Sequence, residues 1–123
     1  MSAPQTTTAS DVLRKAADLI EPAEAWTQNA FSRNHDGTTD EANGDAPAAD
    51  NPVCWCAMGA IAFIAKIDPN DWHAWKISGA NDASKAMETY VSGPVGDWND
   101  APERTQAEVV AALRAAADAS EAP

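Results

Sequence analysis

The chain has 123 residues, a length typical of one domain, and a formal net charge of −11 from 19 acidic and 8 basic residues. A field of this sign repels phosphate backbones and anionic lipid surfaces, so we expect no direct binding to nucleic acid and none to a membrane. No run approaches the roughly 18 apolar residues of a transmembrane helix. Two cysteines without a secretory signal predict a reducing compartment, and we expect a cytoplasmic protein.

Apolar residues make up 45% of the sequence, but alanine supplies 28 of the 123 residues, so few large apolar side chains remain for a core. The five tryptophans therefore have to provide much of the buried contact area. Alanine also favours helix, because it loses no side-chain entropy there. The sequence predicts an all-α fold, a compact bundle of four to five helices around a buried central helix, with one long acidic loop.

The first helix is expected from Ala9 to about Glu21, where apolar residues recur at helical spacing. Thr8 with Asp11 offers a start that resembles a capping box. Pro22 ends this helix, because the residue before a proline avoids the α region.

The helical periodicity disappears from about residue 27 to residue 51. Residues 34–50 lack lysine and arginine, contain glycine and proline, and are predicted to form a mobile acidic loop. The carboxylates of this loop are Asp36, Asp40, Glu41, Asp45 and Asp50. We expect a single helical domain over residues 9–119, between flexible tails at residues 1–8 and 120–123.

A central helix is expected to begin at Asn51 as N-cap, followed by Pro52 at the first helical position. The stretch Cys54–Ile67 is apolar on nearly every face, which is typical of a helix buried on all sides. Gly59 in this helix predicts the close approach of a neighbouring helix, since glycine otherwise costs about 1 kcal/mol relative to alanine.

Three more helices are expected in the rest of the chain, with residues 95–100 extended or in a turn. They are a short helix after Asp68-Pro69 that carries Trp72 and Trp75, one from about Asn81 to Ser92, and one from about Gln106 to Ala119. Thr105 and Glu108 form a capping box before the last of these helices. No internal repeat is expected.

Cys54 is the candidate nucleophile, because the third position of a helix stabilises a thiolate. His35 or His73, if brought close in space, would complete a Cys–His pair. The alternative is that Cys54 and Cys56 are small buried apolar residues, and we favour this alternative because no third orienting group is identifiable. Two positions apart on a helix, the two thiols would point in different directions, so neither a metal site nor a disulfide is expected.

The acidic loop also contains His35, Asp36 and Asp40, but it lacks the oxygen-rich spacing of a calcium loop. We expect no metal and no cofactor, and we interpret these residues as a solvated loop.

Polar residues gather beside aromatic ones near two turns of the chain. The candidate binding residues are Trp26, Gln28, Trp98, Asn99 and Asp100, which would line a small pocket. The alternative is structural, because asparagine and aspartate build turns by bonding to local backbone, and we favour it.

Four segments of the chain form a recognisable combination. They are Trp26-Thr27-Gln28, the helix with Cys56-Ala57-Met58-Gly59-Ala60, Trp98-Asn99-Asp100, and Thr105-x-x-Glu108-Val109. Together they resemble a family of small uncharacterised proteins of actinobacteria, proteobacteria and their phages. The resemblance covers roughly residues 10–117 and implies no activity, because the family is of unknown function. Where the family commonly has glycine, two residues after the glutamine, this chain has Ala30.

Three classes of function are compatible with these observations. The first is a non-enzymatic protein-interaction module of phage or prophage origin, whose acidic surface docks on a partner with a basic surface. The second is a cysteine-dependent enzyme centred on Cys54. The third is a nucleic-acid mimic, which disordered carboxylates in a loop make less favoured. We expect the first class, and the sequence leaves the oligomeric state open.

Overall fold

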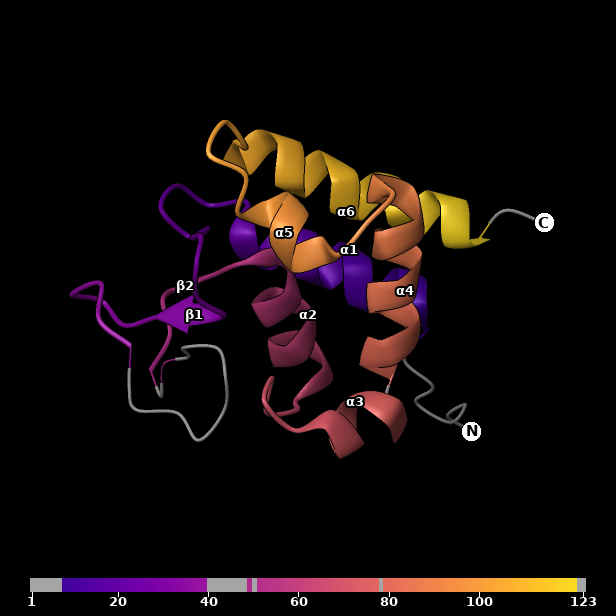
Figure 1. The fold of residues 1–123 in the computed structure, drawn as a ribbon, viewed down its shortest axis with the longest axis horizontal. Helices are drawn as coiled ribbons and strands as arrows, with labels where there is room; N and C mark the ends of the chain where they lie inside the picture. The colour runs from indigo at the N-terminus through magenta and orange to yellow at the C-terminus, as the bar shows by residue number, and fades with distance from the viewer. Residues whose placement is uncertain (1–7, 40–48, 50, 78, 122–123) are drawn as a thin grey trace, which may run out of the picture.

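The computed structural model describes residues 8–39, 49, 51–77 and 79–121, and within these residues the chain is mainly helical (Figure 1). The predicted all-α class is confirmed. Most of the predicted acidic loop, residues 40–48 and 50, lies outside the described residues. The elements in chain order are α1 (Ala9–Ile20), β1 (Ser32–Arg33), β2 (Cys54–Trp55), α2 (Ala57–Ala65), α3 (Trp72–Ile77), α4 (Gly79–Val91), α5 (Val95–Asn99) and α6 (Gln106–Glu121).

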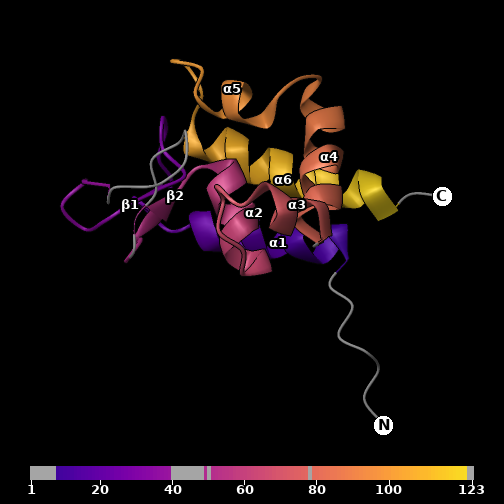
Figure 2. The same cartoon turned by 60° about the horizontal axis from the view of Figure 1, so that its bottom comes forward.

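Helices α1 and α6 run alongside each other and form the most extensive helix–helix contact (Figures 1 and 2). Helix α4 packs against both of them, α2 packs against α1, and the small sheet lies at the edge of the helices, beside α2 and away from α4. The largest fully buried apolar side chains come from α1, α2, α4 and α6: Val12, Leu13, Ile20, Ile61, Met87, Val109 and Leu113. No helix in the described ranges has the length and apolar character needed to cross a lipid bilayer.

Two of the predicted helix starts, those capped by Thr8 and by Thr105, agree with the structure. The Thr8 hydroxyl accepts a hydrogen bond from the Asp11 N–H at 3.1 Å and caps α1. The Thr105 hydroxyl accepts from the Glu108 N–H at 3.2 Å, while the Glu108 carboxylate accepts from the Thr105 N–H at 2.9 Å. The second pair is a complete capping box, so local sequence fixes where α6 begins.

Helices α1 and α6 carry the same motif, Leu-Arg-x-Ala-Ala-Asp-x-x-Glu, at residues 13–21 and 113–121. The expectation of no internal repeat was therefore wrong. In both copies the leucine and the two alanines are buried, and the arginine, aspartate and glutamate lie at the surface. Because the helices are antiparallel, each arginine meets the acidic residues of the other copy.

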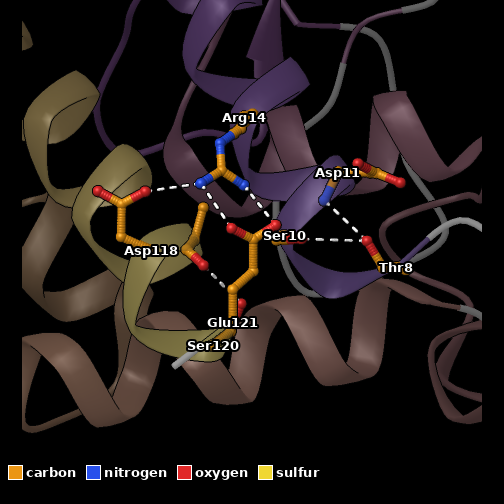
Figure 3. A network of polar contacts seen from close by, with 8 residues as sticks. Thr8, Ser10, Asp11, Arg14, Asp118, Ser120 and Glu121 are labelled. Carbon is orange, nitrogen blue, oxygen red and sulfur yellow. Dashed lines mark hydrogen bonds and ion pairs between the residues drawn. The ribbon is translucent and has the colours of Figure 1, made fainter. Parts of the chain in front are cut away.

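The ion pairs between the two copies are reciprocal. Arg14 contacts Asp118 at 2.6 Å and Glu121 at 3.0 Å, as Figure 3 shows. Arg114 contacts Asp18 at 2.9 Å and Glu21 at 3.0 Å. We call this set of six residues the α1–α6 clamp. Helix α6 continues to Glu121, two residues beyond the predicted end, so Glu121 can take part in the clamp.

The predicted start of the central helix was wrong. Cys54 and Trp55 form strand β2, and α2 begins only at Ala57, with Cys56 as its N-cap. Residues 53–56 are extended because their backbone pairs with residues 25–33, a partner that is distant in sequence. The Asn51-Pro52 signal is compatible with a helix start, but this long-range pairing overrides it.

Gly59 does allow a close approach, although its neighbour is not a helix. A Cβ atom at this position would lie 1.8 Å from the carbonyl oxygen of Phe31, so only glycine fits there. Helix α2 is buried over its first turns, but Phe63 near its end is 48% exposed. The predicted apolar helix is therefore buried over its first turns and exposed to solvent at Phe63.

The remaining boundaries differ from the predictions by small amounts. Helix α4 begins at Gly79, and residues 95–99 form the short helix α5 in place of a turn. Trp55 and Trp75 are buried, and Trp26 and Trp98 are partly buried, which fits the predicted use of tryptophan in the core.

Candidate functional site

Asn99, at the end of α5, lies at the centre of the predicted polar cluster. Its side chain is fully buried, and every hydrogen-bonding group on it has a partner. The Oδ1 atom accepts from the indole Nε1 of Trp26 at 2.8 Å and from the N–H of Ala57 at 3.0 Å. The Nδ2 atom donates to the Thr27 carbonyl at 3.2 Å and to Asp100 Oδ1 at 3.0 Å.

Gln28 and Asp100 extend the same set of contacts. Gln28 Nε2 donates to the carbonyls of Asn99 and Ala101, at 2.9 and 2.8 Å. The Asp100 carboxylate also accepts from the N–H of Asn29 at 2.9 Å. We call the set formed by Trp26, Thr27, Gln28, Ala57, Asn99 and Asp100 the Asn99 network. It joins the turn after α1, the start of α2 and the end of α5.

The segment that carries Trp26 is held in place by backbone pairing. Trp55 N–H donates to the Ala25 carbonyl, and the Trp55 carbonyl accepts from Thr27 N–H. Arg33 then donates to the Thr27 hydroxyl at 2.9 Å and to the Gln28 carbonyl at 3.0 Å. Arg33 was not identified from the sequence, although it is the sole arginine or lysine between Lys15 and Lys66.

Trp98 lies next to Asn99 in the chain but has different contacts. Its ring is covered by the guanidinium of Arg104, 4.0 Å from the ring centroid, and its carbonyl accepts from Arg104 Nε at 2.9 Å. Arg104 also contacts Glu108 at 3.3 Å. Four of the five predicted binding residues therefore share one network of hydrogen bonds, and Trp98 forms a separate stack beside it.

The polar groups of the network form hydrogen bonds within the chain, and these bonds limit which ligands the cluster can bind. The two side-chain amides, of Gln28 and Asn99, donate to oxygens of this chain, and Asp100 accepts from two of its donors. A ligand would have to break these bonds to use them. The outer residues Asp97 and Glu103 differ, because both are exposed and neither forms an ion pair with a described residue.

The cysteines do not occupy the positions expected from the sequence. Cys54 pairs with Arg33 in the sheet and is half-buried, so the argument from a helix N-terminus does not apply to it. Cys56 is buried, and its Sγ accepts a hydrogen bond from the N–H of Gly59 at 3.3 Å. Burial raises the pKa of the Cys56 thiol to about 11, so this thiol is protonated at neutral pH.

The described residues contain no group of three histidine, cysteine, aspartate or glutamate side chains that could hold a metal ion. His35 and His73 are both exposed. Asp36 accepts from the N–H and the hydroxyl of Thr38, and these bonds lower the pKa of its carboxyl group. Asp40, the third residue considered for a cation, lies outside the described residues.

The arginine side chains and many of the acidic side chains differ in whether they contact other groups of the chain. All four arginines contact groups of the chain itself: Arg14 and Arg114 in the α1–α6 clamp, Arg33 in the turn, and Arg104 on Trp98. By contrast, many exposed carboxylates form no ion pair with a described residue. They are Asp11, Glu24, Asp36, Asp68, Asp71, Asp82, Glu88, Asp97 and Glu103.

A model of a family described as being of unknown function matches residues 4–119. This match spans nearly the whole chain and includes the Asn99 network and every residue of the α1–α6 clamp except Glu121. No curated protein and no solved structure matches the chain.

Proposed function

Because the chain belongs to the DUF6197 family, whose description gives no activity, we propose a function from its charges: a protein-interaction module that docks on a basic partner. The supporting observation is the contrast between arginines that contact groups of the chain and exposed carboxylates that form no ion pair with a described residue. An exposed carboxylate without an ion-pair partner keeps its charge available to a second molecule. The net charge of −11 gives the same sign to the long-range field.

We place the contact surface at the outer side of the Trp98 stack. Asp97 directly precedes Trp98 in the chain, and Glu103 directly precedes Arg104, whose guanidinium covers the Trp98 ring. Both carboxylates are exposed, and the partly buried indole offers the amphipathic ring that is enriched at protein interfaces. The Asn99 network lies beneath and fixes the backbone of residues 99–101. In this proposal Trp26, Gln28, Asn99 and Asp100 position the surface, and Asp97, Trp98 and Glu103 touch the partner.

The sequence resemblance adds a further proposal, that the module is of phage or prophage origin. A basic bacterial protein would then be the expected partner. The two other classes, a cysteine-dependent enzyme and a nucleic-acid mimic, gain less support. Cys54 is not at a helix terminus, and Cys56 is buried and protonated.

The proposal is tested by affinity capture from a lysate of the native host, with mass spectrometry to identify what is captured. The test variant is Asp97→Asn with Glu103→Gln, which removes two charges beside Trp98. The matched control is Asp82→Asn with Glu88→Gln on α4, which removes the same charge from another exposed site.

We expect wild type and the control to capture a partner with a basic surface, and the Asp97/Glu103 variant to lose most of it. Capture should also weaken as salt rises, because exposed charges are screened. If the two variants lose the partner equally, the placement beside Trp98 is wrong. If no basic partner is captured by wild type, the proposed function itself is wrong.

A further inference from the structure

The indole N–H of Trp98 is a hydrogen-bond donor that the fold leaves unused. It donates to no described residue, and its nitrogen is not a buried atom, so solvent reaches it. The indole N–H groups of Trp26 and Trp75, by contrast, donate to Asn99 and to the Pro69 carbonyl, both at 2.8 Å. Among the indoles whose side chains are described, that of Trp98 is the one that is both accessible and without an acceptor.

The surroundings of the Trp98 ring limit how a second molecule can contact it. The guanidinium of Arg104 covers one face of the ring, 4.0 Å from its centroid, and the side chain also packs against the apolar core. The covered face is closed to a cation of the partner, because a tryptophan face that already holds one guanidinium has no room for another. The N–H at the edge of the ring is the group left for recognition.

The charges around this edge select the kind of acceptor. Asp97 precedes Trp98 and Glu103 precedes Arg104; both carboxylates are exposed and form no ion pair with a described residue. An anionic acceptor would be repelled by these charges, whereas a neutral acceptor next to cations would be attracted. The turn between α5 and α6 projects from the molecule in both views, so a partner can approach it (Figures 1 and 2).

We propose that the Trp98 surface binds an extended segment of a basic peptide. A backbone carbonyl of the segment accepts from Nε1 of Trp98, and its lysine or arginine side chains lie against Asp97 and Glu103. Carbonyls inside a helix or a sheet already have N–H partners, whereas those of an extended, unpaired segment do not. This inference rests on the proposed function and narrows the partner from a basic surface to a basic tail or loop.

Two probes of equal formal charge separate the carbonyl from the cations. Tetralysine with an acetylated and an amidated end has both backbone carbonyls and ammonium groups, and spermine has ammonium groups without any carbonyl. Each is titrated into the labelled protein while nitrogen–proton correlation spectra record the indole and backbone signals. The indoles of Trp26 and Trp75 serve as internal references, because their N–H groups already have acceptors.

We expect tetralysine to shift the indole proton of Trp98 downfield in a saturable way, with little change at Trp26 and Trp75. Spermine should shift backbone signals near the carboxylates and give no downfield shift of the Trp98 indole, since it has no acceptor. Asp97→Asn with Glu103→Gln should weaken both probes, and the control Asp82→Asn with Glu88→Gln should weaken them less.

The substitution Trp98→Phe keeps a ring beneath Arg104 and removes the N–H. Tetralysine should bind this variant about fivefold more weakly, the usual effect of one hydrogen bond, and spermine should bind it as it binds wild type. Equal weakening of both probes would contradict the hydrogen bond. If Trp98→Phe does not fold, the wild-type titration decides alone.

The outcomes separate this inference from the proposed function. If tetralysine binding depends on Asp97 and Glu103 but the Trp98 indole responds as it does to spermine, the inference is wrong and the proposed docking surface stands. If tetralysine does not bind wild type, or binds the Asp97/Glu103 variant equally well, the inference is wrong together with the placement beside Trp98. Affinity capture of a basic partner then decides the proposed function by itself.

Discussion

The α1–α6 clamp and the Asn99 network both join distant parts of the chain through polar contacts, but their surroundings differ. The clamp consists of charged side chains at the surface, where Asp118 is 76% exposed and Asp18 is 70% exposed. The network is centred on a neutral side chain that is 0% exposed. Water can replace the contacts of the clamp, but it does not reach the side chain of Asn99.

This difference in burial predicts that the free energy of unfolding depends more on the Asn99 network than on the α1–α6 clamp. An exposed ion pair contributes little, because its charges are screened and its side chains lose freedom. A buried donor or acceptor that loses its partner keeps the full cost of desolvation. The more numerous charged contacts of the clamp should therefore matter less than one asparagine.

Asn99→Ala should have the largest effect, a loss of about 3–5 kcal/mol in the free energy of unfolding. It leaves Trp26 Nε1 and the Ala57 N–H without an acceptor, and each buried unpaired group costs about 1–3 kcal/mol. Urea unfolding followed by tryptophan fluorescence measures the change. A loss below about 1 kcal/mol would show that water compensates the network, and the contrast with the clamp would fail.

Gly59→Ala should follow, with a loss of about 1–3 kcal/mol, the usual range for forcing extra atoms into a packed region. The added methyl group would collide with the Phe31 carbonyl and push the segment of the Asn99 network away from α2. Gly96→Ala is the matched control, because nothing lies within 4 Å of a Cβ in that helix. The control should be neutral or slightly more stable, since alanine favours helix. Equal losses in both would contradict the close approach.

Arg14→Gln and Arg114→Gln should each have a smaller effect than either variant above. Their main expected effect is on the pH dependence of the free energy of unfolding. The hydrogen bond from Arg114 lowers the pKa of Glu21, and hydrogen bonds from Ser10 and then Arg14 lower that of Glu121. A lowered pKa in the folded state stabilises it above the ordinary glutamate pKa, about 4.3, and this gain is lost as the pH falls below that value.

The comparison is therefore made by unfolding wild type and the double arginine variant in urea between pH 7 and pH 3. The difference in free energy between the two proteins should shrink as the acid protonates Glu21 and Glu121. A difference that stays constant over this range would mean that the arginines act through packing of their side chains.

Ionisation of Cys56 should have no effect on stability at neutral pH, because the thiol stays protonated there. Chemical labelling of this thiol tests the burial of the start of α2. Its raised pKa, about 11, and its lack of exposure predict slow labelling by iodoacetamide in the folded protein and fast labelling in urea. Half-buried Cys54 serves as the comparison in the same sample. Fast labelling of folded Cys56 would show that the N-cap region opens to solvent.

The parts of the fold that were predictable from the sequence depend on local contacts. The capping box of Thr105 and Glu108 involves residues three apart, and the apolar stripe of α1 is visible in its own sequence. The fold class followed from these signals and from the alanine content. The repeated motif of α1 and α6 was also present in the sequence, and it is recognised once the ion pairs show which residues correspond.

The parts that were not predictable depend on pairing between distant segments. Strand β2 comprises two residues and exists because residues 25–33 approach it, so Cys54-Trp55 was assigned to a helix. The five candidate residues were chosen because polar and aromatic types gather at two turns. Four of them do share hydrogen bonds. The contacts of Arg33 with Thr27 and of the Ala57 N–H with Asn99 join distant segments, so they could be identified only in the structure.

In the proposed function, the residues that hold the Trp98 surface in place differ from the residues that touch the partner. The most direct measurement records capture of the proposed basic partner and the free energy of unfolding for the same protein, Asp97→Asn with Glu103→Gln. We predict unchanged or slightly higher stability, because two repelling charges are removed from a chain of net charge −11, together with a loss of most of the captured partner. A folded variant that captures as much partner as wild type would contradict the account.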